Sequence, residues 1–376
     1  MTHSTTGAPV RKKLAFIAAF PPPISGQSLA AKLLADGLEK SGVFHLSYFD
    51  ISAPIAGSPL PSRIAKLFRV ATDLAFFCLQ NGDGIVYLQL GHGKKALLRD
   101  LIFMSIAMAT HHPYVGHVHG SGLRVALDAL PKPIRTLERI ALQRLSAAIV
   151  LSPSLCSMFD GIAPPNRIFH VDNGIDANFV QLAQQAVRPR PTHDSLRILF
   201  LSNFIAAKGV FDLLEDAQIA QKCGKNYRFV LVGAPQKDNP VADFARQNKL
   251  KNVEIHGIAT GMDKHRHYAD ADVFILPSEY EGQPLCILEA LFEGLPIVTS
   301  PVGGIPDIFR DDESCVRFID PHKPQDFLDA IASLESPDVR AQIAQNARKL
   351  AFSRFTAEKH IENMANILLS LENPPR

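Results

Sequence analysis

Short apolar runs alternate with helix-like stretches along most of this chain, and this alternation is the feature that most constrains its fold. Strand-like runs separated by helical patterns are typical of βα units, in which successive strands pair in parallel. We therefore predict an α/β protein with parallel sheets. The expected strands are residues 14–20, 84–90, 113–119 and 147–152 in a first set and 197–202, 227–233, 253–256, 273–277 and 296–300 in a second.

The length of the chain and one polar segment predict two domains. The chain has 376 residues, which is more than a single hydrophobic core usually supports. Residues 181–195 lie between the two sets of strands, are polar, and include Pro189 and Pro191, so they are expected to form a linker. We expect a first domain at residues 1–190 and a second at residues 191–351.

Composition places the chain among ordinary globular proteins, with 47% hydrophobic and 20% charged residues. Its five cysteines are scattered and form no C-x-x-C motif, so they indicate neither a disulfide framework nor a zinc site. The first apolar run is interrupted by prolines at 21–23, which suits neither a signal peptide nor a membrane span. The expected location is the cytoplasm.

Two carboxylates, Glu281 and Glu289, lie eight residues apart across a predicted helix start. Pro284 suits the first helical position because it has no N–H, and Gly294 suits a left-handed stop, so we predict a helix over residues 284–293. Its first N–H groups would face an anion such as a diphosphate. Glu289, about 7.5 Å along the axis, is then placed to reach a ribose hydroxyl pair, and Glu281 faces a transferred sugar. The alternative is two solvated charges beside an ordinary helix.

The frame around these glutamates resembles the P-S-x-x-E-G-x-P-L segment of the retaining glycosyltransferase family 4, and residues 303–307 resemble that family's G-G-I-P-E. The resemblance covers most of the chain and is most specific over residues 197–307. It implies a GT-B fold, in which two Rossmann-like, doubly wound parallel-sheet domains face each other across a cleft. The first domain would bind the acceptor and the second the nucleotide sugar. Residues 352–376 would form a helix that crosses back to the first domain.

The resemblance also implies roles for individual residues. The family usually shows G-R-x-x-x-x-K-G where this chain has residues 202–209, so Lys208 is retained and Asn203 replaces an arginine that would neutralise the diphosphate. A histidine before glycine at a strand end reaches the sugar in the family, and His119 matches it. The implied catalytic residues are His119, Lys208 and Glu281. The implied donor-binding residues are Gly26, Asn203, Lys208, Glu281, Gly282, Gln283, Pro284, Leu285 and Glu289.

Two motifs have the spacing of metal ligands. His117 and His119 share one face of a strand, but no carboxylate or cysteine beside them completes a site, and His117 is also explained as a packed residue. Asp270 and Asp272 form an Asp-x-Asp motif, which the resemblance matches to a structural segment. We therefore expect no metal and no cofactor, because preorganised donors can stabilise a departing diphosphate.

The implied reaction transfers a hexose-like unit from a nucleotide diphosphate sugar to a hydroxyl acceptor, with retention at the anomeric carbon. The expected acceptor is a glycan or lipid-linked intermediate in the assembly of a bacterial surface polysaccharide or exopolysaccharide. Two alternatives stay open. One is a nucleotide-sugar isomerase or epimerase of the same fold, and the other is a non-catalytic sugar-nucleotide-binding subunit, which Asn203 makes plausible.

The first half of the chain is basic. Residues 1–190 contain 19 Lys and Arg against 11 Asp and Glu, whereas residues 191–376 contain 20 against 26. Arg63, Lys66 and Arg69 recur among apolar residues, a pattern of amphipathic helices that lie on anionic lipid. The alternative is a core helix with a solvated basic face. Peripheral contact with the inner face of a membrane is therefore one hypothesis. Nucleic acid is not an expected partner, since no aromatic-interleaved basic motif is present.

Overall fold

The computed structural model describes residues 11–52, 59–185, 193–235 and 239–371. These residues form two compact units. The first unit includes the described residues up to Gly174 together with those from Ala357 onward, and the second is Ile175–Thr356. Each unit has a six-stranded sheet, and all the paired strands are parallel. The predicted α/β class with two parallel sheets is therefore confirmed.

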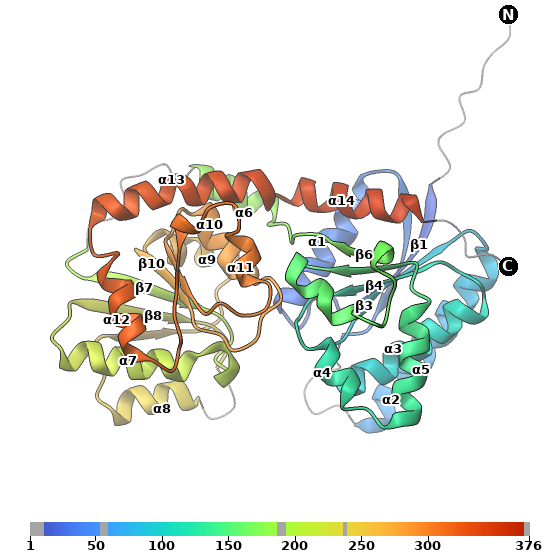
Figure 1. Ribbon diagram of the computed structural model, residues 1–376, viewed down its shortest axis with the longest axis horizontal. Helices are drawn as coiled ribbons and strands as arrows, with labels where there is room; N and C mark the ends of the chain where they lie inside the picture. The colour runs from blue at the N-terminus through green and yellow to red at the C-terminus, as the bar shows by residue number, and fades with distance from the viewer. Residues whose placement is uncertain (1–10, 53–58, 186–192, 236–238, 372–376) are drawn as a thin grey trace, which may run out of the picture. The chain divides into compact units, whose positions relative to one another are not determined.

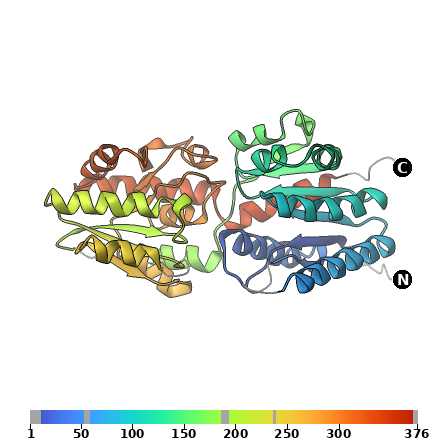
Figure 2. The ribbon, with the colours of Figure 1, turned by 90° about the horizontal axis from the view of Figure 1, so that it is seen from below.

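The first unit is a sheet between two layers of helices (Figures 1 and 2). Its strand order is β2-β1-β3-β4-β5-β6. The strands are β1 (Lys12–Ala18), β2 (Phe44–Asp50), β3 (Ile85–Leu90), β4 (Tyr114–Val118), β5 (Ala147–Val150) and β6 (Ile168–His170). The helices are α1 (Gly26–Lys40) and α14 (Ala357–Ser370) on one face, and α2 (Leu60–Gln80), α3 (Lys94–Ala109), α4 (Leu123–Asp128) and α5 (Lys132–Gln143) on the other.

The second unit has the strand order β12-β11-β10-β7-β8-β9. Its strands are β7 (Leu196–Leu201), β8 (Tyr227–Val232), β9 (Val253–His256), β10 (Val273–Leu276), β11 (Ile297–Thr299) and β12 (Val316–Phe318). Its helices are α6 (Ala177–Gln185), α7 (Val210–Lys222), α8 (Pro240–Gln247), α9 (Gly261–Ala269), α10 (Leu285–Phe292), α11 (Ile305–Ile308), α12 (Pro324–Ala332) and α13 (Pro337–Arg354).

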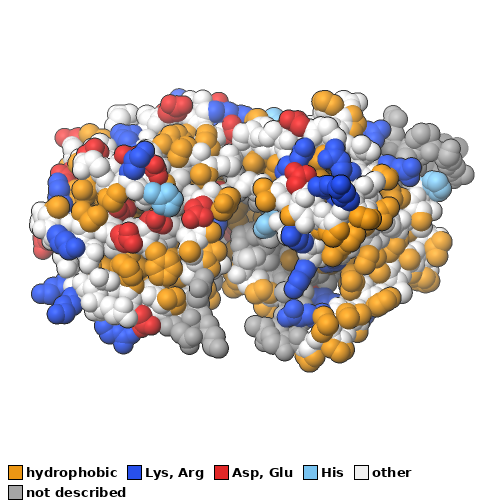
Figure 3. Space-filling view, turned by 60° about the horizontal axis from the view of Figure 1, so that its bottom comes forward, with side chains coloured by type: hydrophobic (Ala, Val, Ile, Leu, Met, Phe, Trp, Pro, Cys, Tyr) orange, Lys and Arg blue, Asp and Glu red, His pale blue; other side chains and the backbone are white. Residues whose placement is uncertain are grey.

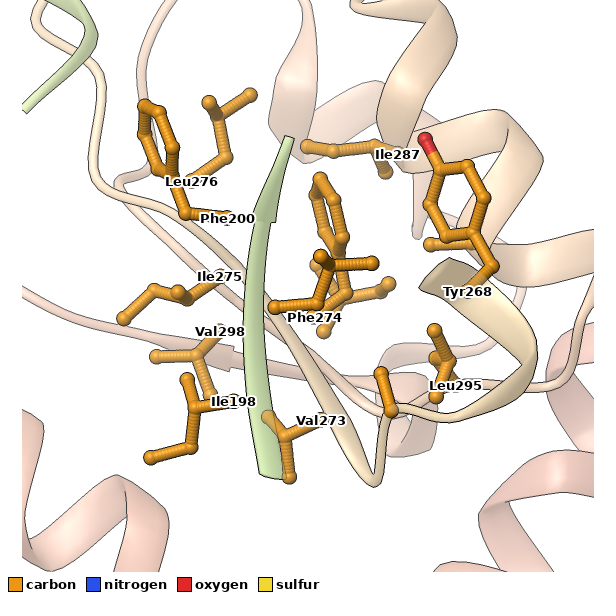
Figure 4. Packing of buried hydrophobic residues seen from close by; sticks show 14 of the residues in the cluster. Ile198, Phe200, Tyr268, Val273, Phe274, Ile275, Leu276, Ile287, Leu295 and Val298 are labelled. Atoms are coloured by element: carbon orange, nitrogen blue, oxygen red, sulfur yellow. The ribbon is translucent and has the colours of Figure 1, made fainter. Parts of the chain in front are cut away.

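The core of the second unit is built around β10, whose four residues are all buried. Figure 4 shows Phe274 beside Tyr268 and Ile287, which come from α9 and α10, while Ile275 and Val298 lie on the other side. The rings of Phe274 and Tyr268 have centroids 5.8 Å apart. Apolar packing on both faces explains the continuous apolar sequence of this strand, and it fixes α9 and α10 against the same sheet.

The limits of the units differ from the expected limits for a packing reason. Phe179 and Ala183 of α6 are buried in the core of the second unit, so the division falls after Gly174 and not near residue 190. Residues 186–192 of the expected linker lie outside the described residues, and residues 181–185 belong to α6. At the other end, α13 continues to Arg354, and α14 packs against α1 in the core of the first unit.

All nine expected strands are present, with ends that differ by at most two residues, while β2, β6 and β12 were not predicted. The helix predicted over residues 284–293 begins one residue later, because Pro284 is its N-cap, with extended backbone angles of φ −70° and ψ 123°. Gly294 ends it with φ +72°, as predicted. Within the described residues, no helix combines the length and apolar character that crossing a bilayer requires.

Candidate functional site

Three loops of the second unit meet beyond the carboxyl ends of β7, β10 and β11, where ligands gather in sheets of this kind. The amide of Glu279 donates to the carbonyl of Ala207 at 3.0 Å, which joins the loops after β10 and β7. The amide of Gly304 donates to the carbonyl of Gly282 at 3.0 Å, which joins the loops after β11 and β10. The backbone itself therefore holds the residues around Glu281 in place.

Two glycines allow this close approach. Gly209 has φ +74°, and a Cβ atom there would lie 2.1 Å from the carbonyl oxygen of Pro277. Gly303 has φ +57°, and a Cβ atom there would lie 1.8 Å from the carbonyl oxygen of Glu281. Any other residue at either position would combine a left-handed backbone with a steric clash.

Glu281 is buried and bound by two neighbours. Its Oε1 atom accepts hydrogen bonds from Lys208 Nζ at 2.6 Å and from Ser278 Oγ at 2.9 Å. Lys208 ends a short 3₁₀ turn, Ala206–Lys208, and its side chain is partly exposed. A charge-assisted bond of this length is a strong one, so Glu281 and Lys208 form a fixed pair beside the start of α10.

Glu289 lies on α10 and is also buried and paired. Lys264 of α9 forms an ion pair with its Oε1 atom, and the hydroxyl of Tyr268 donates to Oε2 at 2.8 Å. Lys264 Nζ also lies 5.3 Å from the ring centroid of Phe179. The sequence analysis identified Glu289 but neither Lys264 nor Tyr268, which lie four residues apart on one face of α9.

Cys286 lies between the two glutamates in sequence. Burial, and then the negative charge of Glu281, raises the pKa of its thiol to about 12. The thiol therefore stays protonated at physiological pH and is not a nucleophile in this state.

The other expected donor-binding residues are near the same helix start. Gly282, Gln283 and Pro284 are buried, and Leu285 is half-buried. Asn203 follows β7 and is exposed, and its carbonyl accepts a hydrogen bond from the amide of Ile205 at 2.8 Å. Because the first N–H groups of a helix have no carbonyl partner within it, the start of α10 can bind an anion.

In the first unit, His119 follows β4 directly, next to a packed His117. His117 is buried, and its Nδ1 atom lies 2.7 Å from the hydroxyl of Tyr87. The two histidine rings have centroids 4.1 Å apart. Burial, followed by the nearby His360 and His92, lowers the pKa of His119 to about 3, so its imidazole is neutral at physiological pH.

The two motifs with metal-like spacing lie in different units, His117 and His119 in the first and Asp270 and Asp272 in the second. Within the described part of the chain, no group of three or more His, Cys, Asp or Glu side chains is arranged to hold a metal ion. Asp272 accepts a hydrogen bond from the amide of Arg197 at 2.9 Å and pairs with Arg340 at 3.4 Å, which ties β10 to β7 and α13. Asp270 is the C-cap of α9. These contacts are structural.

Gly26 begins α1, and a Cβ atom there would meet no other atom within 4 Å. Ser25 before it is the N-cap and forms a capping box with Ser28. The fold of the described residues thus sets no steric requirement for glycine at this position.

The three basic residues expected to contact lipid lie on α2, but they do not form one free basic face. Lys66 pairs with Asp50 at 2.9 Å and also donates to the carbonyl of Ser52. Arg69 lies 3.8 Å from Asp73, and Arg63 is exposed. The side chain of Lys66 thus turns to the β2 end, and contact of these residues with lipid stays a prediction.

Comparison with known proteins shows a family resemblance of the second unit. Residues 184–350 match the family model described as "Glycosyl transferases group 1". The second unit is therefore similar to the group 1 glycosyltransferases over most of its length. The glutamates, Lys208 and the glycines of the three loops all belong to it.

Curated relatives match parts of the chain at low identity. The uncharacterized glycosyltransferase MJ1607 of Methanocaldococcus jannaschii is 24% identical over 276 residues, which are 68% of this chain and 68% of that protein. The amylovoran biosynthesis glycosyltransferase AmsK of Erwinia amylovora is 23% identical over 43% of this chain and 44% of its own length. The MMP alpha-(1->4)-mannosyltransferase of Mycolicibacterium hassiacum is 26% identical over 58% and 52%. The chain thus spans about half the length of the latter two.

Solved structures match nearly the whole chain. Sucrose-phosphate synthase from Thermosynechococcus elongatus has a TM-score of 0.73 at 17% identity, covering 96% of this chain and 99% of the other. Anabaena HepE in complex with UDP and glucose has a TM-score of 0.70 at 19% identity, covering 96% and 100%. At these identities the likeness shows the fold alone, which is GT-B, as the sequence predicted.

Proposed function

We propose that the protein is a retaining glycosyltransferase of family 4 that moves a sugar from a nucleotide diphosphate donor to a hydroxyl acceptor. The observation that carries this proposal is the Lys208–Glu281 pair at 2.6 Å. Three loops that are joined by backbone hydrogen bonds hold this pair beside the start of α10. A cation and free helix N–H groups at one point suit a diphosphate leaving group, and a fixed carboxylate beside them suits a sugar.

In the proposed mechanism, negative charge grows on the departing diphosphate as the bond to the anomeric carbon breaks. Lys208 and the first N–H groups of α10 stabilise that charge, with no step assigned to a metal. Glu281 orients the sugar by accepting hydrogen bonds from its hydroxyls, and Glu289 does the same for the ribose. His119, which lies in the first unit, would act as an uncharged hydrogen-bonding group, because its imidazole is neutral at physiological pH. The acceptor hydroxyl attacks from the face that the diphosphate leaves and passes its proton to an oxygen of the departing diphosphate. This attack retains the anomeric configuration through an oxocarbenium-like transition state.

The donor and acceptor classes are proposed from the relatives. The solved HepE complexes contain UDP or UDP-glucose, which makes a UDP sugar the first donor to test. AmsK and the putative colanic acid biosynthesis glycosyltransferase WcaL of Escherichia coli belong to polysaccharide biosynthesis by their names. We therefore propose a glycan or lipid-linked acceptor in surface or exopolysaccharide assembly. The first unit would bind this acceptor and the second unit the donor, inside the cell.

One observation favours a second candidate function, a non-catalytic sugar-nucleotide-binding subunit. Asn203 is exposed at the end of β7 and contributes no charge where the resembling family has arginine. A binding subunit would take up the donor without turnover. An isomerase or epimerase, in contrast, would convert the donor without any acceptor.

A donor screen followed by product analysis separates these functions. Thermal unfolding is measured with UDP, GDP and ADP sugars, and the stabilising donor is then incubated alone, with water as the only acceptor, and with simple glycoside acceptors. Transfer to a glycoside with retained configuration, read by NMR of the product, supports the proposal. Conversion of the donor alone indicates an isomerase, and stabilisation without any product indicates a binding subunit. If no donor stabilises the protein, the proposed function is wrong.

A further inference from the structure

The outward side of α2 carries a stripe of large apolar side chains. Successive members are three, four or eight residues apart, so they lie along one side of the helix. Each of these residues exposes between 45% and 79% of its surface. The members of the stripe are Leu60, Ile64, Phe68, Phe76 and Leu79. The core-facing side of the helix is a separate set that includes Leu74 and Phe77, so the stripe is additional to the residues that hold the helix in place.

The apolar surface continues onto the neighbouring helices of the same layer. Leu98 and Ile102 of α3 and Leu137 and Ile140 of α5 are exposed large hydrophobic residues. Figure 3 shows hydrophobic side chains, with Lys and Arg beside them, over the region on the right that carries these helices. A contiguous apolar face of this kind on a folded protein marks an interaction surface. We call the outward side of α2, α3 and α5 the outer layer.

The exposed charge of α2, α3 and α5 is mostly basic. The three helices contain nine basic residues, which are Arg63, Lys66, Arg69, Lys94, Lys95, Arg99, Lys132, Arg135 and Arg139. Their acidic residues are Asp73, Asp100 and Glu138, and the last two are completely buried. Burial, and then the proximity of Asp100, raises the pKa of Glu138 to about 8, so it is mostly neutral at physiological pH. Asp73 is the one exposed acid of these three helices.

We propose that the outer layer docks the protein on an anionic lipid bilayer. The exposed Phe, Leu and Ile side chains would enter the interface, while Lys and Arg side chains reach lipid phosphates on either side of them. Charge complementarity favours this occupant, because the three helices that carry the apolar stripe have nine basic residues and a single exposed acid, and of the nine only Lys66 turns to Asp50 and Ser52 of the β2 end. This proposal goes beyond the proposed function and needs none of the transfer chemistry.

Vesicle flotation tests the proposal. The full chain is mixed with vesicles of phosphatidylcholine alone or of phosphatidylcholine with phosphatidylglycerol, at low and high salt. Two variants address the two parts of the surface, Phe68→Ser with Leu79→Ser for the stripe and Lys94→Glu with Lys95→Glu for the charge. The matched control is Leu369→Ser with Lys40→Glu, because α14 and α1 cover the opposite face of the sheet and Leu369 is 45% exposed.

The wild-type protein should bind the anionic vesicles and bind neutral ones weakly. The stripe variant should bind at least roughly ten-fold more weakly at both salt concentrations. The affinity of the charge variant for anionic vesicles should fall roughly five-fold or more per charge at low salt, and by less at high salt. The control should bind like wild type. Acidic residues at the start of α3 suit a helix N-terminus, so the charge variant should fold normally, which circular dichroism checks.

Three results overturn the proposal. The first is a wild-type protein that does not bind anionic vesicles, and the second is a stripe variant that binds as the control does. The third is a wild-type protein that does not bind vesicles but forms a dimer in light scattering, when the stripe variant is a monomer. That result would assign the outer layer to contact with a second copy of the chain. Each of these is independent of the donor screen, so the proposed function stands or fails separately.

Discussion

Lys264 and Glu289 form a buried ion pair, and Tyr268 donates to the second oxygen of the same carboxylate at 2.8 Å. Glu281 is paired in the same way by Lys208. Each glutamate of the motif therefore has a lysine from a neighbouring element, so neither is an isolated buried charge. For Glu289, the proposed ribose-binding residue, the lysine fixes the carboxylate in the position where ribose hydroxyls would donate to it.

Lys264→Met should weaken the binding of a ribonucleotide more than the binding of its 2′-deoxy analogue. Without the lysine, the carboxylate of Glu289 keeps only the Tyr268 hydroxyl and is no longer held for two hydroxyls. We expect the Kd for UDP to rise roughly ten-fold, about 1.4 kcal/mol, while the Kd for 2′-deoxy-UDP changes less. Isothermal titration of both nucleotides measures the ratio.

Lys264→Arg is the matched variant, because it keeps the cation and should restore much of the preference for ribose. The pair is mostly buried, so Lys264→Met should also lower the free energy of unfolding by about 3 kcal/mol. An unchanged ratio of the two Kd values in a folded Lys264→Met protein contradicts the positioning role. It leaves the donor assignment intact, because UDP binding is measured in the same experiment.

Glu281→Gln should reduce turnover and leave donor binding nearly unchanged. The amide keeps the size of the side chain but loses the charge that orients the sugar and pairs with Lys208. We expect kcat to fall roughly 100-fold, comparable to the loss of one preorganised group in other active sites, with the donor Kd within about three-fold of wild type. Steady-state transfer kinetics and nucleotide titration give the two values.

Lys208→Ala should reduce both turnover and donor affinity, because the ammonium group would contact the diphosphate before and during its departure. Glu289→Ala should reduce donor affinity with less effect on kcat. Ser278→Ala is a milder control, since it removes only one neutral hydrogen bond to Glu281. Wild-type transfer rates in the Glu281, Lys208 and Glu289 variants together would falsify the assignment of this site.

Asn203→Arg should tighten donor binding. Asn203 is exposed at the end of β7, so a longer side chain has room there, and the new guanidinium would bring a charge to the proposed diphosphate site. We expect the Kd for the nucleotide diphosphate to fall roughly five-fold, with a smaller effect on the nucleoside monophosphate. If the diphosphate and monophosphate respond equally, or neither responds, the diphosphate does not lie beside this residue.

The strands that sequence reasoning missed share their place in the sheets, although the edge strand β9 was predicted. The missed strands β2, β6 and β12 are all at sheet edges. An edge strand is packed less completely, so its sequence mixes polar and apolar residues; β2 reads Phe-His-Leu-Ser-Tyr-Phe-Asp, and the other two have three residues each. Central strands such as β5 and β10 are buried throughout and give continuous apolar runs.

The parts of the site that could be predicted are those set by local sequence. Glu281, Pro284 and Glu289 lie within one segment, so their relation is set by local helix geometry that the sequence encodes. Ser278, three residues before Glu281, belongs to the same segment, whereas Lys264 comes from α9 and meets Glu289 only in the folded unit. The spacing of Lys264 and Tyr268 places both on one face of a helix, but only the folded unit shows that this face meets α10.

Gly303→Ala should displace the loop that carries Glu281. The new Cβ would lie 1.8 Å from the carbonyl oxygen of Glu281, at a backbone φ of +57°. Gly224→Ala is the matched control, because Gly224 has φ +64° but a Cβ there would meet nothing within 4 Å. The control should cost about 1 kcal/mol from the left-handed backbone alone, and Gly303→Ala about 3 kcal/mol or more with loss of transfer activity. Chemical denaturation compares the two, and equal costs would contradict the steric explanation.

The stability of the first unit should fall on mild acidification because of its buried histidines. Burial lowers the pKa of His117 well below 6.5 and, as the main cause, lowers that of His360 from 6.5 to about 4. Between about pH 6.5 and pH 4, the unfolded chain therefore binds protons at these positions that the folded unit does not. The contribution of these histidines to the free energy of unfolding is fully present above about pH 6.5. It decreases as the pH falls, by up to about 1.4 kcal/mol per pH unit for each histidine.

Urea denaturation at several pH values between about 7.5 and 5 measures this slope. His360→Asn keeps a donor toward the carbonyl of Asp172, which His360 Nδ1 contacts at 2.7 Å, and removes one titrating group. The variant should therefore be less sensitive to pH than wild type. His45→Asn is the control, since His45 is an exposed residue of β2 and its replacement should leave the slope unchanged. A slope that is the same in wild type and His360→Asn means that His360 becomes protonated in the folded unit, and the explanation by burial is then wrong.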